Sequence, residues 1–455
     1  FDCFGLCWNW SGSRCGSLPG CEREMMELLQ ELFHVKEKGS SLRTELLASA
    51  TSFFSIVYIV AVNALILSQA GMDYNSVVIA TILTTAVSNI LMGLYANSPL
   101  ILAPGMSDNA FFTYILVGAF AFTWQQSLSI IFIVGLLFFL LTHFNVVDQL
   151  LRSIPVTLIK GMSAGVGFFL IFLGLKNGGI IVSSEGTIVA LNNIFQPVPL
   201  TLLATLLVGL ILFVKNVKGN FLLTIIFGVL ISIALGVTDI SSFSYSFIDL
   251  GSLEPFVFQL DFSGVLSMDY WVAVFSLLIL VVFQNLGTQV SFLTSEQPKV
   301  LKRTLESNAL SVMIAGLLGC SSTCTSAEGA TGIAVGGRSG LTSFMVGVYF
   351  LFTIALIPFI ALIPLAVISA LLIIVGSLLA ANNLKGINFD DFTEYFPAIL
   401  MVLMMVLTFN IADGIGWGFI LYTFIKVFSG DRQAVSKMMY GLTGIFILYF
   451  VLKFI

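Results

Sequence analysis

The sequence predicts a polytopic α-helical membrane protein with about fourteen transmembrane helices, two of them broken. Composition, the spacing of apolar runs and two polar interruptions lead to this prediction. Of the 455 residues, 58% are hydrophobic and 9% are charged, and the mean hydropathy is +1.04. A soluble domain needs a surface on which roughly a quarter of the residues are charged, so none is expected. At about 30 residues for each crossing and its connection, the chain holds fourteen or fifteen spans and little else.

The apolar runs fall into two sets of seven. The first set lies at residues 46–69, 76–96, 99–118, 126–146, 156–175, 199–215 and 219–236. The second set lies at residues 270–294, 305–319, 326–337, 341–361, 363–383, 396–411 and 413–429. A last run, 438–455, is either an extra span or a helix along the membrane interface. Because seven spans precede the second set, its orientation is opposite to that of the first, which permits an inverted repeat.

These runs divide the chain into two seven-helix units, 45–237 and 270–430. The polar segment 238–269 connects them, the stretch 25–44 precedes them and the hydrophobic segment 431–455 follows. Basic residues gather beside alternate ends of the runs, at Lys36, Lys38, Arg43, Arg152, Lys215, Lys218, Lys299, Lys302, Arg303, Arg338 and Lys385. The positive-inside rule therefore places the N-terminus in the cytoplasm and 238–269 outside. We expect a multi-pass protein of the cytoplasmic membrane.

The first 24 residues differ in composition from the rest of the chain. They carry Cys3, Cys7, Cys15 and Cys21, in a spacing unlike the paired cysteines of zinc sites. No uninterrupted apolar core precedes a small-residue cleavage site, so the segment does not resemble a signal peptide. We expect residues 1–24 to be a leader or non-native sequence, and we expect no metal site and no cofactor.

The third run of each set contains a polar interruption. Residues 102–110 hold a Pro-Gly pair followed by Asp108, and residues 319–329 hold small and polar residues up to Glu328. Unpaired backbone at that depth persists only where it lines a cavity or contacts protein. Corresponding broken spans in two halves point to the central site of a transporter, and ionisable residues there indicate function. The alternative is that each carboxylate only caps the half-helix that follows it.

The eighth run turns polar at residues 284–289, where Gln284 and Thr288 lie on one helical face. These side chains either form hydrogen bonds between helices or bind a planar heterocycle, since an amide offers a donor and an acceptor in one plane. In the fifth run, Lys160 is expected to reach the cytoplasmic surface. The same run holds a face of small residues suited to close helix packing, namely Gly161, Gly165 and Gly167.

At these positions the sequence resembles the nucleobase cation symporter family that includes the bacterial uracil permease. It is most similar to the azaguanine-like hypoxanthine/guanine/adenine permease branch, over residues 32–455. The residues that carry the resemblance are Ser41–Ala48, Ile66–Met72, Leu102–Met106, Asn109–Tyr114, Gly336–Thr342, Asp390–Glu394 and Ile411–Ile415. The resemblance implies two inverted repeats of seven helices, in which a core of spans 1–4 and 8–11 moves against a gate of spans 5–7 and 12–14. It also implies proton-driven uptake of a purine base.

In that branch an Asn of the third span, acids of the eighth span and a Glu of the tenth span hold the base. The resemblance assigns these roles to Asn109 and Glu328, but the eighth span has Val281 and Gln284 where relatives usually carry two acids. In the third span, Ser107-Asp108 replaces a usual Gly-Leu. The predicted substrate-binding residues are Asp108, Asn109, Gln284, Asn285, Thr288 and Glu328. Glu328 or Asp108 is predicted to carry the coupling proton.

The predicted partners are a guanine-, hypoxanthine- or adenine-like nucleobase, protons, membrane lipid and a second copy of the chain in a homodimer; no nucleic acid is expected. The alternative is a transporter or channel of the same fold for uracil, xanthine or an anion. An ATP-driven pump is not expected because the chain has no G-x4-G-K-[ST] loop. Of the intramembrane enzymes, a metalloprotease is excluded because only His34 and His143 are present, without an H-E-x-x-H motif, whereas an enzyme with a Ser or acid mechanism stays an alternative.

Overall fold

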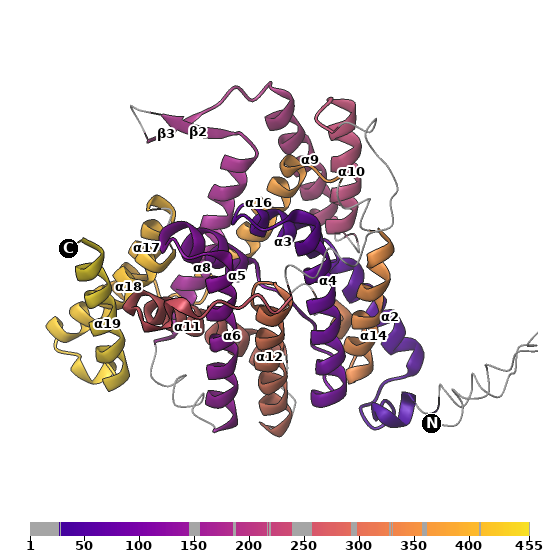
Figure 1. Ribbon diagram of the computed structural model, residues 1–455, viewed down its shortest axis with the longest axis horizontal. Coiled ribbons are helices and arrows are strands. Elements are labelled where there is room, and N and C mark those ends of the chain that lie inside the picture. Colours follow the sequence, from indigo (N-terminus) through magenta and orange to yellow (C-terminus); the bar gives the residue numbers. More distant parts are fainter. Residues whose placement is uncertain are drawn as a thin grey trace, which may run out of the picture.

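The computed structural model describes residue 27 and residues 29–144, 155–184, 188–215, 217, 220–238, 257–292, 298–326, 329, 331–356, 362–408 and 411–454. Helices dominate this part of the chain and cross one another at varied angles (Figure 1). Glu328 and the four N-terminal cysteines lie outside the described residues.

The first seven predicted runs correspond to the elements from α2 to α10. These are α2 (Leu42–Ile56), α3 (Ile59–Ser68), α4 (Tyr74–Leu91), the π-helical turn η1 (Met92–Ala96), β1 (Leu102–Pro104), α5 (Met106–Ala110), the π-helical segment η2 (Phe111–Ala119), α6 (Trp124–His143), α8 (Val156–Asn177), α9 (Pro197–Val214) and α10 (Asn220–Ala234). Between α8 and α9 a hairpin pairs β2 (Ile181–Ser184) with β3 (Ile188–Leu191).

The second seven runs correspond to the elements from α11 to α18. A short 3-10 turn, η4 (Ser263–Leu266), precedes them. They are α11 (Met268–Phe292), α12 (Pro298–Leu318), β4 (Thr323–Thr325), α13 (Thr331–Val335), α14 (Gly340–Phe352) with the 3-10 turn η6 (Thr353–Leu356), α16 (Leu365–Leu384), α17 (Phe392–Leu407) and α18 (Ile411–Phe428). The last run forms α19 (Lys437–Phe454), which follows the turn η7 (Arg432–Ala434) and packs on α18.

Seven helices in the described ranges are long and apolar enough to cross a membrane unaided. The remaining runs are shorter, more polar or broken, and the two interruptions predicted from the sequence are confirmed. One further break was not predicted: the first run divides at Val57 and Tyr58 into α2 and α3. Just before this break the Ser55 hydroxyl donates to the carbonyl oxygen of Thr51. Such contacts within a helix often bend it.

The two broken spans meet at their strands. β1 pairs with β4 antiparallel, so that Ala103 lies opposite Cys324. Two backbone hydrogen bonds continue the pairing beyond the strands, from Gly105 N to the Ser322 carbonyl and from Ser326 N to the Ile101 carbonyl. The third and tenth spans therefore cross in opposite directions, as two inverted repeats require.

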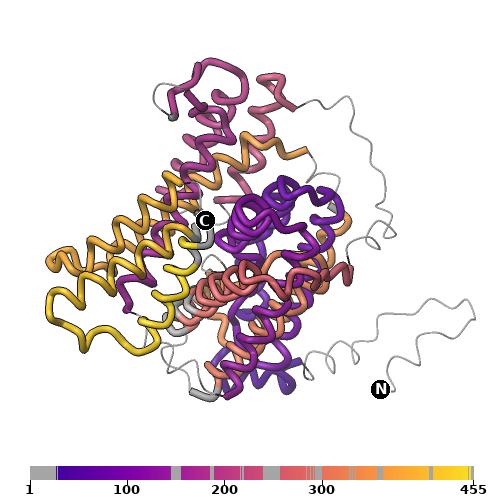
Figure 2. Tube along the Cα trace, turned by 60° about the vertical axis from the view of Figure 1, so that its left-hand side comes forward, coloured from indigo at the N-terminus to yellow at the C-terminus, as the bar shows by residue number. Residues whose placement is uncertain are grey.

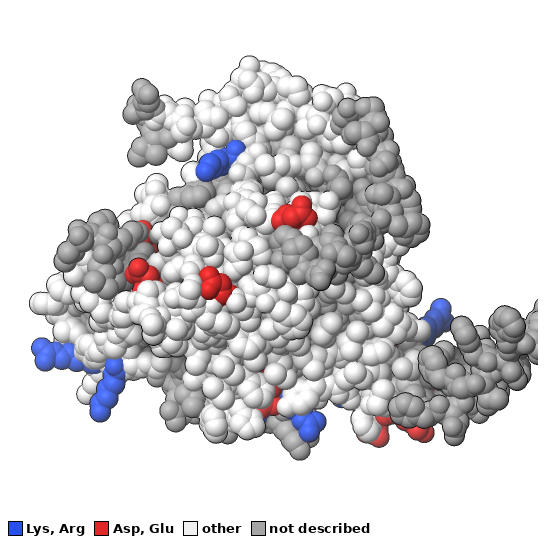
Figure 3. All heavy atoms as spheres, viewed as in Figure 1, with Lys and Arg blue, Asp and Glu red and all other residues white. Residues whose placement is uncertain are grey.

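The helices form two bodies, a core and a gate (Figure 2). In the core, α4 packs on α12 and α14, and α6 packs on α11 and α12. In the gate, α8 packs on α16 and α17, α9 packs on α10 and α16, and α17 packs on α18. Figure 3 shows that the visible surface is largely uncharged, with most of its Lys and Arg side chains toward the lower edge of the view. A surface with so few charges is typical of a protein that contacts lipid.

Glu45 joins the start of the first span to the start of α14. Its carboxylate is fully buried and accepts hydrogen bonds from the N–H groups of Arg338 and Ser339 and from the Thr342 hydroxyl. These donors belong to the N-terminus of α14, where backbone N–H groups need acceptors. Two of the motifs that carry the family resemblance are therefore in contact, and they act here to hold the core together.

The small residues of α8 pack closely on the rest of the gate, as predicted. A Cβ atom built on Gly161 would lie 3.0 Å from the Ala398 side chain. One built on Gly167 would lie 2.6 Å from the Ala380 nitrogen and 2.7 Å from the Gly376 carbonyl oxygen. Since these neighbours of Gly167 are backbone atoms, α8 and α16 can approach this closely only without a side chain there.

We expect Gly167→Ala to lower the thermal stability of the purified protein, because the added methyl group forces α8 and α16 apart. Overpacking of this kind costs about 1–3 kcal/mol. The matched control is Gly441→Ala in α19, where an added Cβ meets no atom within 4 Å. Thermal unfolding in detergent would compare the two variants, and equal melting temperatures would contradict the packing role of Gly167.

Candidate substrate-binding site

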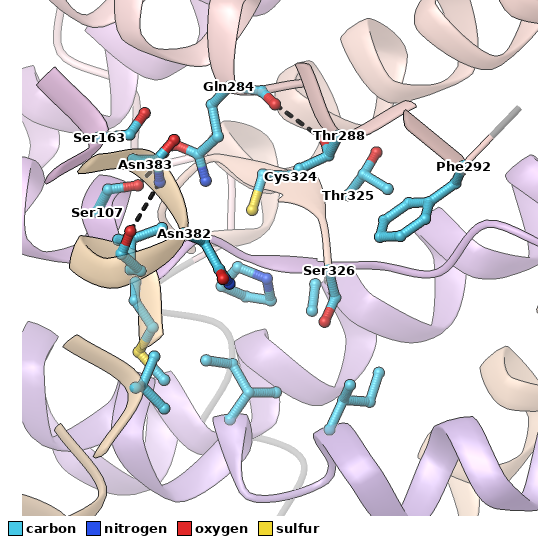
Figure 4. A pocket seen from close by; sticks show the side chains of 18 of the residues that line it. Ser107, Ser163, Gln284, Thr288, Phe292, Cys324, Thr325, Ser326, Asn382 and Asn383 are labelled. Atoms are coloured by element: carbon cyan, nitrogen blue, oxygen red, sulfur yellow. Dashed lines mark hydrogen bonds between the residues drawn. The ribbon is translucent and has the colours of Figure 1, made fainter. Parts of the chain in front are cut away.

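A cavity of about 330 Å³ lies between the core and the gate, beside the point where β1 and β4 pair, which we call the strand crossing (Figure 4). The core contributes residues from the end of α2 and the start of α3, from β1 and the start of α5, from α11 and from β4. The gate contributes residues from α8 and α16. The polar side chains that line it are Lys160, Ser107, Ser163, Gln284, Thr288, Thr325, Ser326, Asn382 and Asn383.

Amide side chains hold the two strands in place. Asn89 of α4 donates to the carbonyl oxygen of Leu102 (2.7 Å) and accepts from its N–H (2.9 Å). On the other strand, Asn285 of α11 accepts a hydrogen bond from the Thr325 N–H (2.8 Å), and Gln289 donates to the Thr325 hydroxyl (2.9 Å). The backbone of the broken spans is thus paired with side chains as well as with the opposite strand, as backbone buried at this depth requires.

Gln284 and Thr288 of α11 both line the cavity. The Gln284 Oε1 atom accepts a hydrogen bond of 2.6 Å from the Ser107 hydroxyl. The Thr288 hydroxyl lies 2.9 Å from the carbonyl oxygen of Gln284 and 3.1 Å from that of Asn285, and it can donate to either of them within its own helix. In Figure 4 these side chains lie on the wall that the core presents to the cavity. The amide of Gln284 can therefore reach a molecule in the cavity directly.

Asp108 lies just behind this wall. Its side chain is 1% exposed and does not line the cavity. The Ser107 hydroxyl lies 3.3 Å from Oδ1, the Ser322 hydroxyl faces the carboxyl group, and Oδ2 makes no hydrogen bond to the described residues. A Cβ atom built on Gly105 would lie 2.7 Å from Oδ2. Asp108 lies in the first turn of α5, but among the described residues neither of its carboxyl oxygens accepts a hydrogen bond from a backbone N–H of that helix.

Asn109 is fully buried and points away from the cavity lining, into the contact between the first, third and tenth spans. Its Oδ1 accepts a hydrogen bond of 2.5 Å from the Ser321 hydroxyl, which also contacts Asn63. Asn63 in turn donates to the Thr81 hydroxyl. In this structure Asn109 belongs to a buried polar network that joins these spans.

The gate wall was not predicted as part of the site. Lys160 and Ser163 of α8 and Asn382 and Asn383 of α16 line the cavity. The Lys160 stem lies along Gly386, since a Cβ atom there would lie 3.1 Å from the lysine Cδ. The consecutive asparagines at the end of an apolar run were a signal that sequence reasoning missed. Among the described lining residues none is acidic, and Lys160 is the charged one.

An ion pair joins the gate helices α17 and α18 close to the start of α8. Lys426 of α18 lies 2.8 Å from the Glu394 carboxylate of α17. Glu394 also accepts hydrogen bonds from the Thr157 hydroxyl of α8 and the Tyr422 hydroxyl. Hydrogen bonds from the side chain and backbone of Thr393, and the charge of Lys426, lower the pKa of Asp391 beside this cluster. The helix that carries Lys160 and Ser163 is thereby joined to α17 and α18.

Sequence comparison decides the family. Residues 43–417 match the Permease family. The chain belongs to this family. This permease is 33% identical over 433 residues to the adenine permease AdeP of Escherichia coli, covering 93% of this chain and 96% of that one. It is 33% identical over 444 residues to the guanine/hypoxanthine permease PbuG of Bacillus subtilis, covering 93% and 99%. The resemblance inferred from the motifs is confirmed, and the protein is a multi-pass membrane transporter.

A solved structure has the same fold as this permease. The transmembrane domain of the cyanobacterial bicarbonate transporter BicA aligns with a TM-score of 0.63 at 17% identity, covering 82% of this chain and 97% of that domain. At this identity the similarity establishes the fold alone. It confirms the all-helical membrane-transporter fold predicted from the sequence.

We expect neighbouring amides of α11 in this permease to differ in their effect on stability. Asn285→Ala leaves the buried Thr325 N–H without its acceptor, which costs about 1–3 kcal/mol. Gln284→Ala leaves the Ser107 hydroxyl with a second acceptor, Asp108 Oδ1. Thermal unfolding of the two variants is the measurement. A melting temperature of Asn285→Ala no lower than that of Gln284→Ala would contradict the supporting role of Asn285.

Proposed function

We propose that this permease takes up a purine nucleobase across the cytoplasmic membrane and couples uptake to protons. The names of its relatives AdeP and PbuG, adenine and guanine/hypoxanthine permeases, support a purine substrate. The structural observation that carries the proposal is the cavity between core and gate, which has polar side chains on both walls and lies beside the paired strands of the two broken spans. Substrate sites of secondary transporters lie in such positions.

The chemistry of the cavity suits a planar heterocycle. Its volume of about 330 Å³ falls in the range of small-ligand sites. Apolar side chains, among them Ile59, Phe292 and Leu379, can cover the faces of a ring. The amides of Gln284 and of the asparagine pair can then meet the donors and acceptors on its edge. Lys160 adds a positive charge that favours an oxygen or ring nitrogen nearby.

The cavity lies toward one end of the bundle. Lys160 lies near the start of α8, Asn383 near the end of α16, and Phe292 ends α11. Since these helix ends adjoin the basic residues Arg152, Lys385 and Lys299, the positive-inside rule assigns them to the cytoplasm. We therefore propose that the cavity faces the cytoplasm and that the N-terminus lies on the same side.

The proposed division of roles follows the position of each side chain. Gln284 and Thr288 contact the base, and Asp108 or Glu328 carries the coupling proton. Asn109 and Asn285 stay predicted substrate residues, although their hydrogen bonds here go to Ser321 and to Thr325. A carrier for uracil, xanthine or an anion is the alternative, and Lys160 is the observation that favours an anion.

We expect cells that lack their own base permeases to accumulate radiolabelled guanine, hypoxanthine or adenine when they make this protein. Accumulation should rise as the external pH falls, because each base enters with a proton, and a protonophore should abolish it. Glu328→Gln should lose accumulation, since Gln forms hydrogen bonds but cannot titrate. The control is Glu306→Gln, because Glu306 contacts Tyr95 and His143 away from the cavity.

The results of this experiment discriminate between the proposed function and its alternatives. Uptake of xanthine or uracil alone would support the alternative substrates, and equilibration without accumulation would indicate a channel. Accumulation by Glu328→Gln with an unchanged pH dependence would exclude Glu328 as the proton carrier.

A second experiment tests whether Asp108 replaces the acid that is missing at position 284. Asp108→Leu and Gln284→Asp should each impair uptake, whereas the double variant should recover part of it. The reason is that residues in one hydrogen-bonded network have non-additive effects, and Ser107 contacts both side chains. Uptake of five bases, namely guanine, hypoxanthine, adenine, xanthine and uracil, would be measured at equal surface expression. Strictly additive losses would mean that the two positions act independently.

A further inference from the structure

Ser107 connects the buried carboxyl group to the cavity. Its Oγ atom lies 2.6 Å from Gln284 Oε1 and 3.3 Å from Asp108 Oδ1. Ser107 and Gln284 line the cavity, whereas Asp108 lies behind it. The three side chains form one row of hydrogen-bonding groups that runs from the buried carboxyl group to the cavity.

A serine hydroxyl has a single hydrogen, so it can donate to only one neighbour at a time. A carbonyl oxygen cannot donate, so the 2.6 Å contact means that Ser107 donates to Gln284. The Nε2 group of Gln284 makes no hydrogen bond to any described residue and is available to the cavity. In this arrangement the Ser107 oxygen has a lone pair that can accept a hydrogen bond from the O–H of a protonated Asp108.

The arrangement reverses when Asp108 ionises and draws a hydrogen bond from Ser107, in addition to the Ser322 hydroxyl that faces the same carboxyl group. A carboxylate only accepts hydrogen bonds, so the Ser107 hydrogen turns to Asp108 Oδ1. Gln284 can then keep its contact with Ser107 only by rotating its amide and donating from Nε2. That rotation turns its carbonyl oxygen toward the cavity. The proton lost by Asp108 leaves to the solution on the side to which the cavity opens, and no covalent bond other than this O–H changes.

We propose that Ser107 is a hydrogen-bond switch that couples the protonation of Asp108 to the side of the Gln284 amide presented to the substrate. This inference rests on the proposed function. With Asp108 protonated, the amide presents a donor and binds the acceptor edge of a base, which is a carbonyl oxygen or a ring nitrogen. With Asp108 ionised, the amide presents an acceptor, which repels the same edge. Binding of the base and binding of the proton therefore favour each other.

Few ionisable groups surround this row. The elements packed against α5 are α3, η2, α8 and α11. Their ionisable side chains are Tyr114 of η2, Lys160 and Lys176 of α8, and Asp269 and Tyr270 of α11. Of these, Lys160 lines the cavity, and the Cys324 thiol of β4 also lies at the crossing. Glu328 lies outside the described residues, so its removal serves as a separate arm of the test.

The test compares Ser107→Ala with Ser107→Thr, which keeps the hydroxyl. In the wild-type protein, the apparent affinity for hypoxanthine should rise as pH falls, by up to about tenfold per pH unit for one linked proton. Ser107→Ala should make the affinity independent of pH and reduce accumulation to the equilibrium ratio, while exchange of labelled for unlabelled base continues. Ser107→Thr should restore the pH dependence. Asp108→Asn combined with Ser107→Ala should be no worse than either change alone.

Ser107→Gly is a second variant that removes the hydroxyl. We choose glycine because it is usual at this position in the family that the sequence resembles. The Glu328→Gln arm should keep the pH dependence of affinity if Asp108 alone drives the switch. A wild-type pH profile in Ser107→Ala or Ser107→Gly would overturn the switch. If the wild-type protein transports no base, the proposed function fails, and if it transports bases with no effect of pH, the switch is wrong although transport stands.

Discussion

The fold depends on one constraint: backbone groups exposed by a broken helix inside a membrane must find partners in the protein. Each unpaired group there costs several kcal/mol. β1 and β4 meet this requirement by pairing with each other, and their remaining groups pair with the amides of Asn89 and Asn285. The helices that carry these amides, α4 and α11, are thereby fixed against the crossing. The position of the core helices follows from this arrangement.

The same arrangement produces the cavity. Two short strands occupy less width than two helices, and the cavity lies between the paired strands and the gate helices α8 and α16. The core wall of that space is held by hydrogen bonds to backbone. The gate wall stands on α8 and α16, which pack on each other through glycine, and Thr157 of α8 donates to the Glu394 carboxylate that pairs with Lys426. Each wall is therefore stabilised by contacts within its own body, the core or the gate. A movement of gate against core would therefore change the cavity without dismantling either wall.

Much of this architecture could be predicted from the sequence, because apolar runs and their interruptions are local signals. The Pro104-Gly105 pair and the small residues before Glu328 located both breaks. The sequence could not tell Gln284, which lines the cavity, from Asn285, which holds β4, because an amide satisfies its hydrogen bonds equally well with backbone or ligand. The roles of Asn109 and of the gate residues depend on contacts between distant segments. Such contacts leave no trace in the spacing of residues along one helix.

The long sequence separation of the stabilising contacts has a consequence for biosynthesis. Glu45 emerges from the ribosome with the first span, but Thr342, which donates to it, is 297 residues away in the chain. Asn109 likewise precedes its donor Ser321 by 212 residues. These polar groups of the first half therefore lack the partners shown here until the later segments have been synthesised. A nascent chain that stops before the tenth span would leave these groups without those partners, so quality-control proteases would meet an incomplete product rather than a stable half-transporter.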